Sequence, residues 1–238
     1  NTAGTVSGLG NEAVTISDTT SVAVTSLNTL DGKTTGTINA STIQSLTGTA
    51  ADINTAYASS GISGLGDEAV TISDTSLAAT VLNTLDGNTT GAVNAATITT
   101  FTSSTAATLN TAYASSGITN LGNEAVTLSD TSLASTVLNT LDGNTTGTVN
   151  AATVTTLTGT AATANTAYAS SGITGLGNEA VTLSDTSLAT TVLNTLDGNT
   201  TGAVNAATVL TLTGTAATAN TAYASSGISG LGNEAVTL

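Results

Sequence analysis

The sequence lacks histidine, cysteine, methionine, tryptophan and proline, and its only basic residue is Lys33. Without histidine and cysteine there is no imidazole base, no thiolate nucleophile, and no zinc or other transition-metal site with the usual ligands. Without arginine, and with a single lysine, the chain has no clamp for phosphate groups. We therefore expect that the protein is not an enzyme.

The charge is almost entirely negative, with 15 acidic residues and a net charge of -14 at pH 7. Such a charge repels nucleic acids and anionic membrane surfaces. No apolar run is long enough to span a bilayer, and no signal peptide is visible. We expect neither nucleic-acid binding nor membrane insertion. The few charged residues, the absence of thiols and the abundance of Thr, Ala, Ser, Asn and Gly suit an extracellular or cell-surface protein.

What the sequence does contain is a repeat with a period of about 55–56 residues. The phrase NEAVT, once DEAVT, places glutamates at Glu12, Glu68, Glu124, Glu179 and Glu234. We interpret residues 1–238 as one continuous array of about four copies, with partial repeats at both ends. Neither end carries the polar cap that a free-standing solenoid needs. We therefore expect a segment of a longer array, or a subunit whose ends dock onto neighbours.

Each repeat consists of two similar halves of about 27–28 residues. Val126 opens VTLSDTSLASTVLNTLDGNTTG, and Val154 opens VTTLTGTAATANTAYASSGITG. Both halves run from a β-branched start through a Thr- and Ala-rich stretch to a glycine. A unit of this length that cannot bury its own apolar face must stack on its neighbours.

Residues 68–87 illustrate the first kind of half. Residues 70–73 alternate between β-branched apolar and small polar side chains, which predicts a short strand. Leu77, Val81 and Leu85 lie at every fourth position and predict one stripe of a helix. Residues 74–76 offer Asp, Thr and Ser as N-terminal caps, and we expect Gly87 to end the helix in a left-handed conformation.

Residues 40–61 illustrate the second kind of half. Ile43 and Leu46 lie in a strand region, and Thr49 with Asp52 predicts an N-terminal capping pair for a helix that Gly61 ends. The predicted fold is an α/β solenoid of stacked strand–short-helix coils, about 27–28 residues each and two per repeat, with a parallel sheet. The alternative is an all-β solenoid, because Thr-rich segments are weak helix formers.

Repetition is also expected to stack asparagines and carboxylates above one another. Asparagine amides can bond to the coils on both sides. Stacked carboxylates repel one another unless they are spread out or neutralised, and calcium would neutralise them. The phrase DGNTTG matches the first half of an EF-hand loop, although Thr97 stands at the twelfth place where glutamate is required. The alternative is a helix end followed by a turn. The candidate calcium ligands are Asp31, Asp86, Asn88, Asp142, Asn144, Asp197 and Asn199.

The phrases LTGTAADINTAYASSGISGLG and SLAATVLNTLDGNTTG resemble the repeat arrays of giant, repetitive bacterial cell-surface proteins, particularly those of marine cyanobacteria. The phrase LNTLDG, preceded by Thr and Ala, is similar to the short repeat of phage tail-fibre shafts. The resemblance covers the whole chain. It implies an extracellular mechanical or adhesive role and assigns no catalytic residue.

Three functions follow as expectations. The first is a structural segment of an extracellular filament, surface layer or adhesin stalk, whose partner is another copy of itself, end to end or laterally. The second is a binding module whose regular Thr-rich face matches ice or a polysaccharide. The third is a phage tail-fibre shaft, which would be trimeric.

Overall fold

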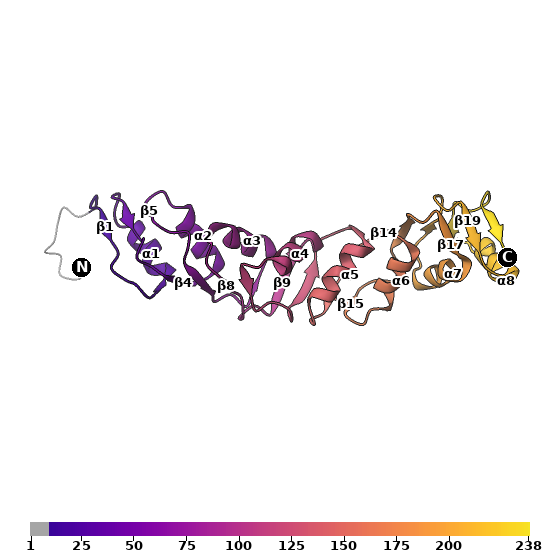
Figure 1. Cartoon of the computed structure of the whole chain (residues 1–238), viewed down its shortest axis with the longest axis horizontal. Coiled ribbons are helices and arrows are strands. Elements are labelled where there is room, and N and C mark those ends of the chain that lie inside the picture. The colour runs from indigo at the N-terminus through magenta and orange to yellow at the C-terminus, as the bar shows by residue number, and fades with distance from the viewer. Residues whose placement is uncertain (1–9) are drawn as a thin grey trace. The chain divides into compact units, whose positions relative to one another are not determined.

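The structure is a computed structural model that describes residues 10–238 (Figure 1). The described chain divides into two compact units, unit 1 with residues 10–100 and 111–121, and unit 2 with residues 101–110 and 122–238. The described part contains short parallel strands and helices of eight to ten residues. The predicted α/β solenoid is confirmed, and the all-β alternative is wrong.

The elements of unit 1 are β1 (Val14–Thr15), β2 (Ser21–Ala23), α1 (Val24–Asp31), β3 (Ile38–Asn39), β4 (Ser45–Gly48), α2 (Ala50–Ala58), β5 (Ile62–Ser63), β6 (Ala69–Ile72), β7 (Ser76–Leu77), α3 (Ala79–Asn88), β8 (Val93–Asn94) and β10 (Ile118–Thr119). The elements β9 (Thr100–Ser104) and α4 (Ala106–Ala114) hold residues of both units. The elements of unit 2 are β11 (Ala125–Leu128), β12 (Ser132–Ala134), α5 (Ser135–Asn144), β13 (Val149–Asn150), β14 (Thr156–Gly159), α6 (Ala161–Ala169), β15 (Ile173–Thr174), β16 (Ala180–Leu183), β17 (Ser187–Ala189), α7 (Thr190–Asn199), β18 (Val204–Asn205), β19 (Thr211–Thr213), α8 (Ala216–Ala224), β20 (Ile228–Ser229) and β21 (Ala235–Thr237).

The strands pair in parallel, each with the strand one turn of the chain away. In unit 1 the strands lie in the orders β1-β3-β5 and β2-β4-β6-β8-β10. In unit 2 they lie in the orders β11-β13-β15, β12-β14-β16-β18-β20 and β17-β19-β21. Helices stack in the same sequence, α1 on α2 on α3 in unit 1 and α5 on α6 on α7 on α8 in unit 2.

The hydrogen-bonded turn of the chain is shorter than the half-repeat. Leu157 pairs with Val181, and Val181 pairs in turn with Val204. One such turn takes about 24 residues, the same separation that the bond between Ala161 and Asp185 spans. Because the half-repeat has about 27–28 residues, adjacent strands come from different positions in the repeat.

The expected length of about 27–28 residues per coil agrees with the spacing of the helices along the chain. It does not agree with the spacing of the paired strands. The starts of α5 and α7, at Ser135 and Thr190, lie one full repeat apart with α6 between them, so two helices recur per repeat as expected. The expected spacing of about 27–28 residues is wrong for the paired strands. Each repeat accordingly supplies five strands rather than two, as β11 to β15 illustrate.

The core of each unit is a line of fully buried aliphatic side chains from successive strands and helices. In unit 2, Leu157 and Leu212 of the strands and Leu138 and Leu193 of the helices are each 0 % exposed. Small Ala161 at the start of α6 is buried to the same degree. Since each turn is thin, no turn has a core without its neighbours, as in other solenoids.

The expected helices exist, but several of their expected boundaries are wrong. Leu77 lies in β7 and not in the helix, and the helix α3 has Ala78 as its N-cap, with no side-chain cap. Gly87 lies inside α3, which continues to Asn88. Thr49 does cap α2 by accepting a hydrogen bond from the Asp52 backbone N–H, but α2 ends at Ala58, before Gly61.

Candidate functional site

The candidate calcium ligands lie at the helix ends and bond to other side chains. In α3, the Asp86 Oδ2 accepts a hydrogen bond from the Ser115 hydroxyl at 2.7 Å, whereas the Asn88 Nδ2 donates to the Asn54 Oδ1 at 2.9 Å. Asp86 therefore bonds to a coil that comes later in the chain, because Ser115 follows it. Asn88 bonds to a coil that comes earlier, because Asn54 precedes it.

The same pattern recurs in the other candidates. Aspartate–serine bonds of 2.7 Å join Asp31 to Ser59, Asp142 to Ser170 and Asp197 to Ser225. Asparagine–asparagine bonds join Asn144 to Asn110 and Asn199 to Asn165. Within residues 10–238, no group of three or more Asp, Glu, His or Cys side chains is placed to hold a metal ion. Calcium binding stays a prediction.

The glutamates of the NEAVT phrase are buried in the three inner copies, whereas Glu12 and Glu234 are half-buried. Glu68 and Glu179 are 0 % exposed. The Glu179 Oε2 accepts a hydrogen bond from the Tyr168 hydroxyl at 2.9 Å and from the Gly177 N–H at 2.8 Å. The Oε1 atoms of Glu68 and Glu179 are buried and have no partner in the structure. These carboxylates are internal hydrogen-bond acceptors, because a buried carboxylate without donors would be strongly unfavourable.

The tyrosines that face these glutamates hold their protons tightly. Burial, with the nearby carboxylate as a smaller cause, raises the pKa of Tyr57 and Tyr168 well above the usual value of about 10. The folded state therefore binds this proton more tightly than the unfolded chain. The stability that results is present below about pH 10 and is lost as the pH rises above that value.

We accordingly predict an alkaline limit to stability. The melting temperature should fall as the pH rises above about 10, because the unfolded chain then releases tyrosine protons that the folded chain retains. Replacing both Tyr57 and Tyr168 by phenylalanine should make this decline shallower. Melting followed by circular dichroism between pH 8 and 12 checks the prediction, and an equally steep decline in the double variant would contradict it.

The aspartates of the SDT phrase cap helices of the preceding turn. Asp74 Oδ2 accepts a hydrogen bond from the Ala50 N–H at 2.7 Å, at the start of α2. Asp130 and Asp185 do the same for Ala106 in α4 and Ala161 in α6, each at 2.8 Å. A carboxylate at a helix N-terminus satisfies a free N–H group and is favoured by the helix dipole.

This geometry predicts unequal effects for equivalent aspartates. Asp130→Ala should lower the free energy of unfolding by about 1 kcal/mol, because the N–H of Ala106 loses its acceptor. Asp18→Ala is the matched control, since Asp18 is exposed and makes no hydrogen bond within residues 10–238. Urea unfolding of both variants measures the difference. Equal losses would show that the cap contributes nothing.

Threonine hydroxyls also bond to neighbouring turns. The hydroxyls of Thr89, Thr145 and Thr200 donate to the carbonyls of Glu68, Glu124 and Glu179 at 2.7 Å. Thr153 donates to the Leu128 carbonyl at 3.0 Å, and Thr155 donates to the Thr131 carbonyl at the same distance. Many threonines are therefore used within the structure and are not a free hydroxyl array.

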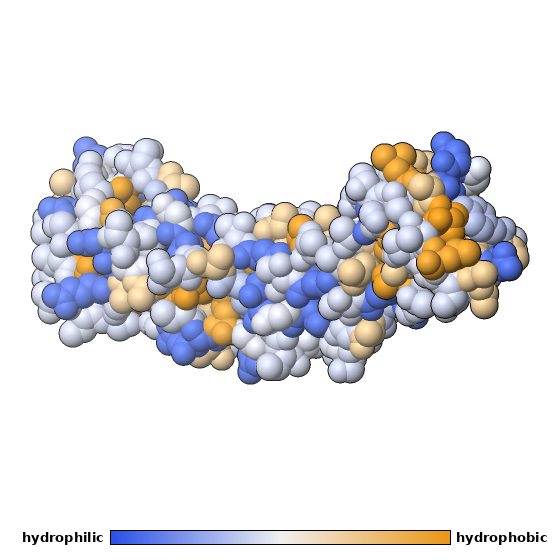
Figure 2. Space-filling view, turned by 45° about the vertical axis from the view of Figure 1, so that its right-hand side comes forward, coloured by the Kyte–Doolittle hydropathy of each residue, from blue (hydrophilic) through white to orange (hydrophobic). Residues whose placement is uncertain are grey.

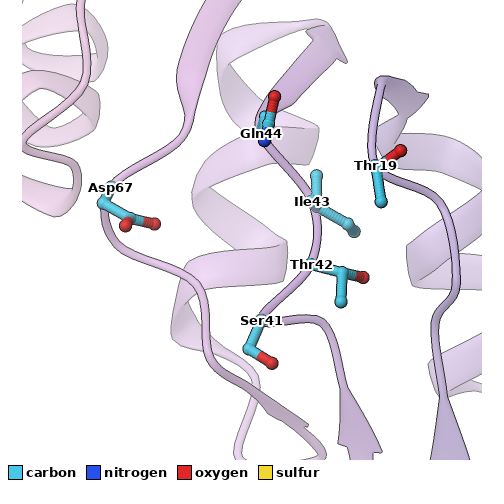
Figure 3. A pocket seen from close by; sticks show the side chains of 6 residues that line it. All are labelled: Thr19, Ser41, Thr42, Ile43, Gln44 and Asp67. Carbon is cyan, nitrogen blue, oxygen red and sulfur yellow. The ribbon is translucent and has the colours of Figure 1, made fainter.

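A polar pocket of about 420 Å³ lies in unit 1, where the first copy departs from the repeat. Its lining residues are Thr19, Ser41, Thr42, Ile43, Gln44 and Asp67. Figure 3 shows them on three neighbouring segments, with Thr19 and Asp67 on the outer two. The third copy has Ala152, Thr155 and Asn178 in place of Ser41, Gln44 and Asp67, and there the Thr155 N–H bonds to the Thr131 carbonyl at 2.8 Å.

Comparison with known proteins gave no family model, no curated relative and no solved structure that matches this chain. None of the helices in residues 10–238 has the length and hydrophobicity that crossing a bilayer requires.

The residues that sequence reasoning missed are the buried glutamates and the aspartates that cap the preceding turn. The signal in the sequence is the constant spacing of the NEAVT and SDT phrases. Once the length of a turn is known, this spacing identifies the residues that the glutamates and aspartates contact.

Proposed function

We propose that this chain is a structural protein of the cell surface or extracellular space, a segment of a long filament, surface layer or adhesin stalk built by stacking repeats. The observation that supports this most is where the repeated polar residues are bonded. Asp185, Asn165 and Thr200 each bond to a neighbouring turn. Repetition of these residues therefore serves cohesion between turns, and it needs no substrate or ligand.

The proposal extends to partners and chemistry. The partner is another copy of the same array, end to end or laterally. The net charge of -14 and the single lysine disfavour nucleic acid as a partner. We propose that the protein is not an enzyme, because the chain lacks the side chains that most catalytic sites use. Calcium bound at the helix ends would add to cohesion.

Electron microscopy of the native protein, with and without a calcium chelator, tests the proposed function. Long filaments or a regular layer support it, and their fraying after chelation supports calcium at Asp86 and its equivalents. Short particles of one size that never join would contradict a filament. Labelling of intact producing cells tests the location, and label confined to the cell interior would contradict the cell-surface proposal.

A binding module is the second candidate, and the unit 1 pocket favours it. Its hydroxyl, amide and carboxylate groups suit a polyol or sugar better than an apolar ligand. An ice-binding face is less favoured, because hydroxyls such as those of Thr153 and Thr155 donate to backbone carbonyls. Thermal hysteresis of the protein in solution would support ice binding. A trimeric mass of an isolated segment would favour the tail-fibre alternative.

A further inference from the structure

The unit 1 pocket lies where several departures of the first copy from the repeat come together. The lining residues Ser41, Gln44 and Asp67 each differ from their equivalents in the later copies. Those equivalents are Ala96, Thr99 and Asn123 in the second copy, Ala152, Thr155 and Asn178 in the third, and Ala207, Leu210 and Asn233 in the fourth. The first copy also has one extra residue here, because DTTS at 18–21 replaces DTS at 74–76.

The first copy lacks a backbone contact that closes this place in the other copies. In the third copy the Thr131 carbonyl accepts hydrogen bonds from the Thr155 and Thr156 N–H groups, at 2.8 and 3.2 Å. The second and fourth copies make the same pair of bonds. Within residues 10–238, the Gln44 N–H has no equivalent bond to residues 19–20, where the extra residue lies. The two segments are therefore not joined at this point, and a pocket remains between them.

The polar groups of the pocket are free to bind a ligand. The side chains of Ser41, Gln44 and Asp67 are exposed and make no hydrogen bond within the described residues. Thr42 differs from them, because its hydroxyl donates to the Ile16 carbonyl at 2.8 Å. The pocket therefore offers a ligand one free hydroxyl, one amide and one carboxylate from these three side chains.

The charge of the pocket is negative and uncompensated. Asp67 is the only charged residue among the described residues that line it, and Figure 3 shows its carboxylate directed toward the central segment, residues 41–44. The only basic residue of the chain, Lys33, does not line the pocket, and the net charge is -14. The pocket therefore attracts a cationic ligand and repels an anionic one.

The size and lining of the pocket suit a small polar molecule. Its volume of about 420 Å³ lies within the range of about 300 to 1,000 Å³ that small-molecule sites have. None of the described lining residues is aromatic, and Ile43 is only 3 % exposed. On the face of unit 1 at the left of Figure 2, hydrophobic residues form small patches among hydrophilic and intermediate ones. A ligand is therefore held mainly by hydrogen bonds and charge.

We propose that this pocket binds an amino sugar, a polyhydroxylated ring that carries one ammonium group. Asp67 accepts hydrogen bonds from the ammonium group, and Ser41 and Gln44 bind the ring hydroxyls. Such a ligand matches the single charge and the neutral polar groups together, which neither a simple amine nor an uncharged sugar does. The ligand is a free amino sugar or one unit of a polysaccharide. The inference rests on the binding function given above as the second candidate, and it names the ligand class of that site.

An NMR titration of the full 238-residue chain with glucosamine tests the proposal, at about pH 6 where the amine is protonated. We expect saturable shifts of the amide signals of residues 41–44 and 67, with a dissociation constant of about 1 mM. Glucose should bind about two- to fivefold more weakly, the contribution of an exposed ion pair, and glucuronate should not bind. A glucosamine trimer that binds more tightly than the monomer identifies a polysaccharide as the source, whereas equal binding identifies the free sugar.

A charge-neutral double variant tests the role of Asp67. Asp67→Asn combined with Asn178→Asp moves the carboxylate to the third copy and keeps the net charge at -14. Both substitutions install residues that other copies have at the same position, so the fold should persist, which circular dichroism checks. The double variant should lose the preference for glucosamine over glucose and should gain no site in the third copy, where the backbone contact is closed. Gln44→Thr should weaken both ligands alike, by about two- to tenfold.

The absence of saturable shifts up to about 50 mM glucosamine, or equal shifts at Asn123 and Asn178, would overturn the pocket as a specific site. A preference for glucosamine that survives in the double variant would overturn the amino-sugar assignment. The structural function has a separate readout. Native filaments formed by a chain that does not bind glucosamine would contradict this inference alone, whereas saturable binding by a chain that forms neither filaments nor a layer would contradict the structural function alone.

Discussion

Replacing Gly147 by alanine should unfold or severely destabilise unit 2, with a loss of about 3 kcal/mol or more in the free energy of unfolding. Gly147 ends the phrase LNTLDGNTTG and lies against the backbone of the preceding turn. A methyl group there would overlap the Glu124 carbonyl and the Ala125 backbone nitrogen. Both obstacles are backbone atoms, so no side-chain rotation relieves the overlap. Glycine is therefore required for two turns to approach closely.

Gly143→Ala is the matched control, because the same phrase holds both glycines. Gly143 lies inside α5, and a methyl group there meets nothing within 4 Å. Glycine inside a helix is unfavourable relative to alanine, so this variant should gain about 0.5 to 1 kcal/mol. Guanidinium unfolding of the two variants provides the comparison. A loss for Gly143→Ala equal to that for Gly147→Ala would contradict the close contact between turns.

Tyr168→Phe should cost about 1.5 to 3 kcal/mol, the range for a hydrogen bond to a charged group. The Tyr168 hydroxyl donates to the Glu179 Oε2 at 2.9 Å, and Glu179 is 0 % exposed. The other oxygen of this carboxylate, Oε1, is already without a partner. Loss of the hydroxyl would leave the buried group with one hydrogen bond, from the Gly177 N–H, and water has no ready access.

The end of the chain supplies the control for this prediction. Tyr223 donates to the Glu234 Oε2 at 3.0 Å, but Tyr223 is 43 % exposed and Glu234 is only half-buried. Water can replace the lost donor, so Tyr223→Phe should change stability by less than about 0.5 kcal/mol. Thermal and urea unfolding of both variants measure the two effects. If the two variants lost equal stability, burial of Glu179 would not be the cause.

The fold class could be predicted from the sequence because its signals are local. The alternation in residues 69–72 and the spacing of apolar residues from Leu77 to Leu85 indicate a strand and a helix, and β6 and α3 lie there. Thr49 was identified as the cap of α2 for the same reason, since its partner lies within the first turn of the helix. The constant period of the NEAVT phrase then indicated stacking.

The contacts between turns could not be predicted from the sequence. Which residues meet depends on the number of residues in one turn, and the repeat period does not give this number. The sequence shows a half-repeat of about 27–28 residues, whereas strands pair at steps of about 24 residues. The sequence offers Asp74 as one of three candidate caps, with Thr75 and Ser76, for the helix that follows, yet Asp74 caps α2 in the preceding turn. The burial of Glu68 could not be predicted for a related reason, because the turn that covers it comes from residues distant in the sequence.

The asparagines illustrate the same limit. Repetition suggested that identical asparagines bond to one another. Instead the Asn139 Nδ2 donates to the Thr163 carbonyl at 2.9 Å, and the Asn144 Nδ2 donates to Asn110, which belongs to the other half-repeat. Because a turn is shorter than the half-repeat, residues at the same position of successive half-repeats do not lie above one another. Each asparagine therefore meets a residue from a different position of the repeat.

If the repeated residues serve to join one turn to the next, stability must grow with the number of joined turns. The most direct measurement is equilibrium unfolding in guanidinium of a series of chains with two, three, four and five repeats. We predict that the unfolding free energy and its denaturant dependence rise by a constant amount with each added repeat, because each brings the same interface. A stability that does not depend on the number of repeats would contradict this role.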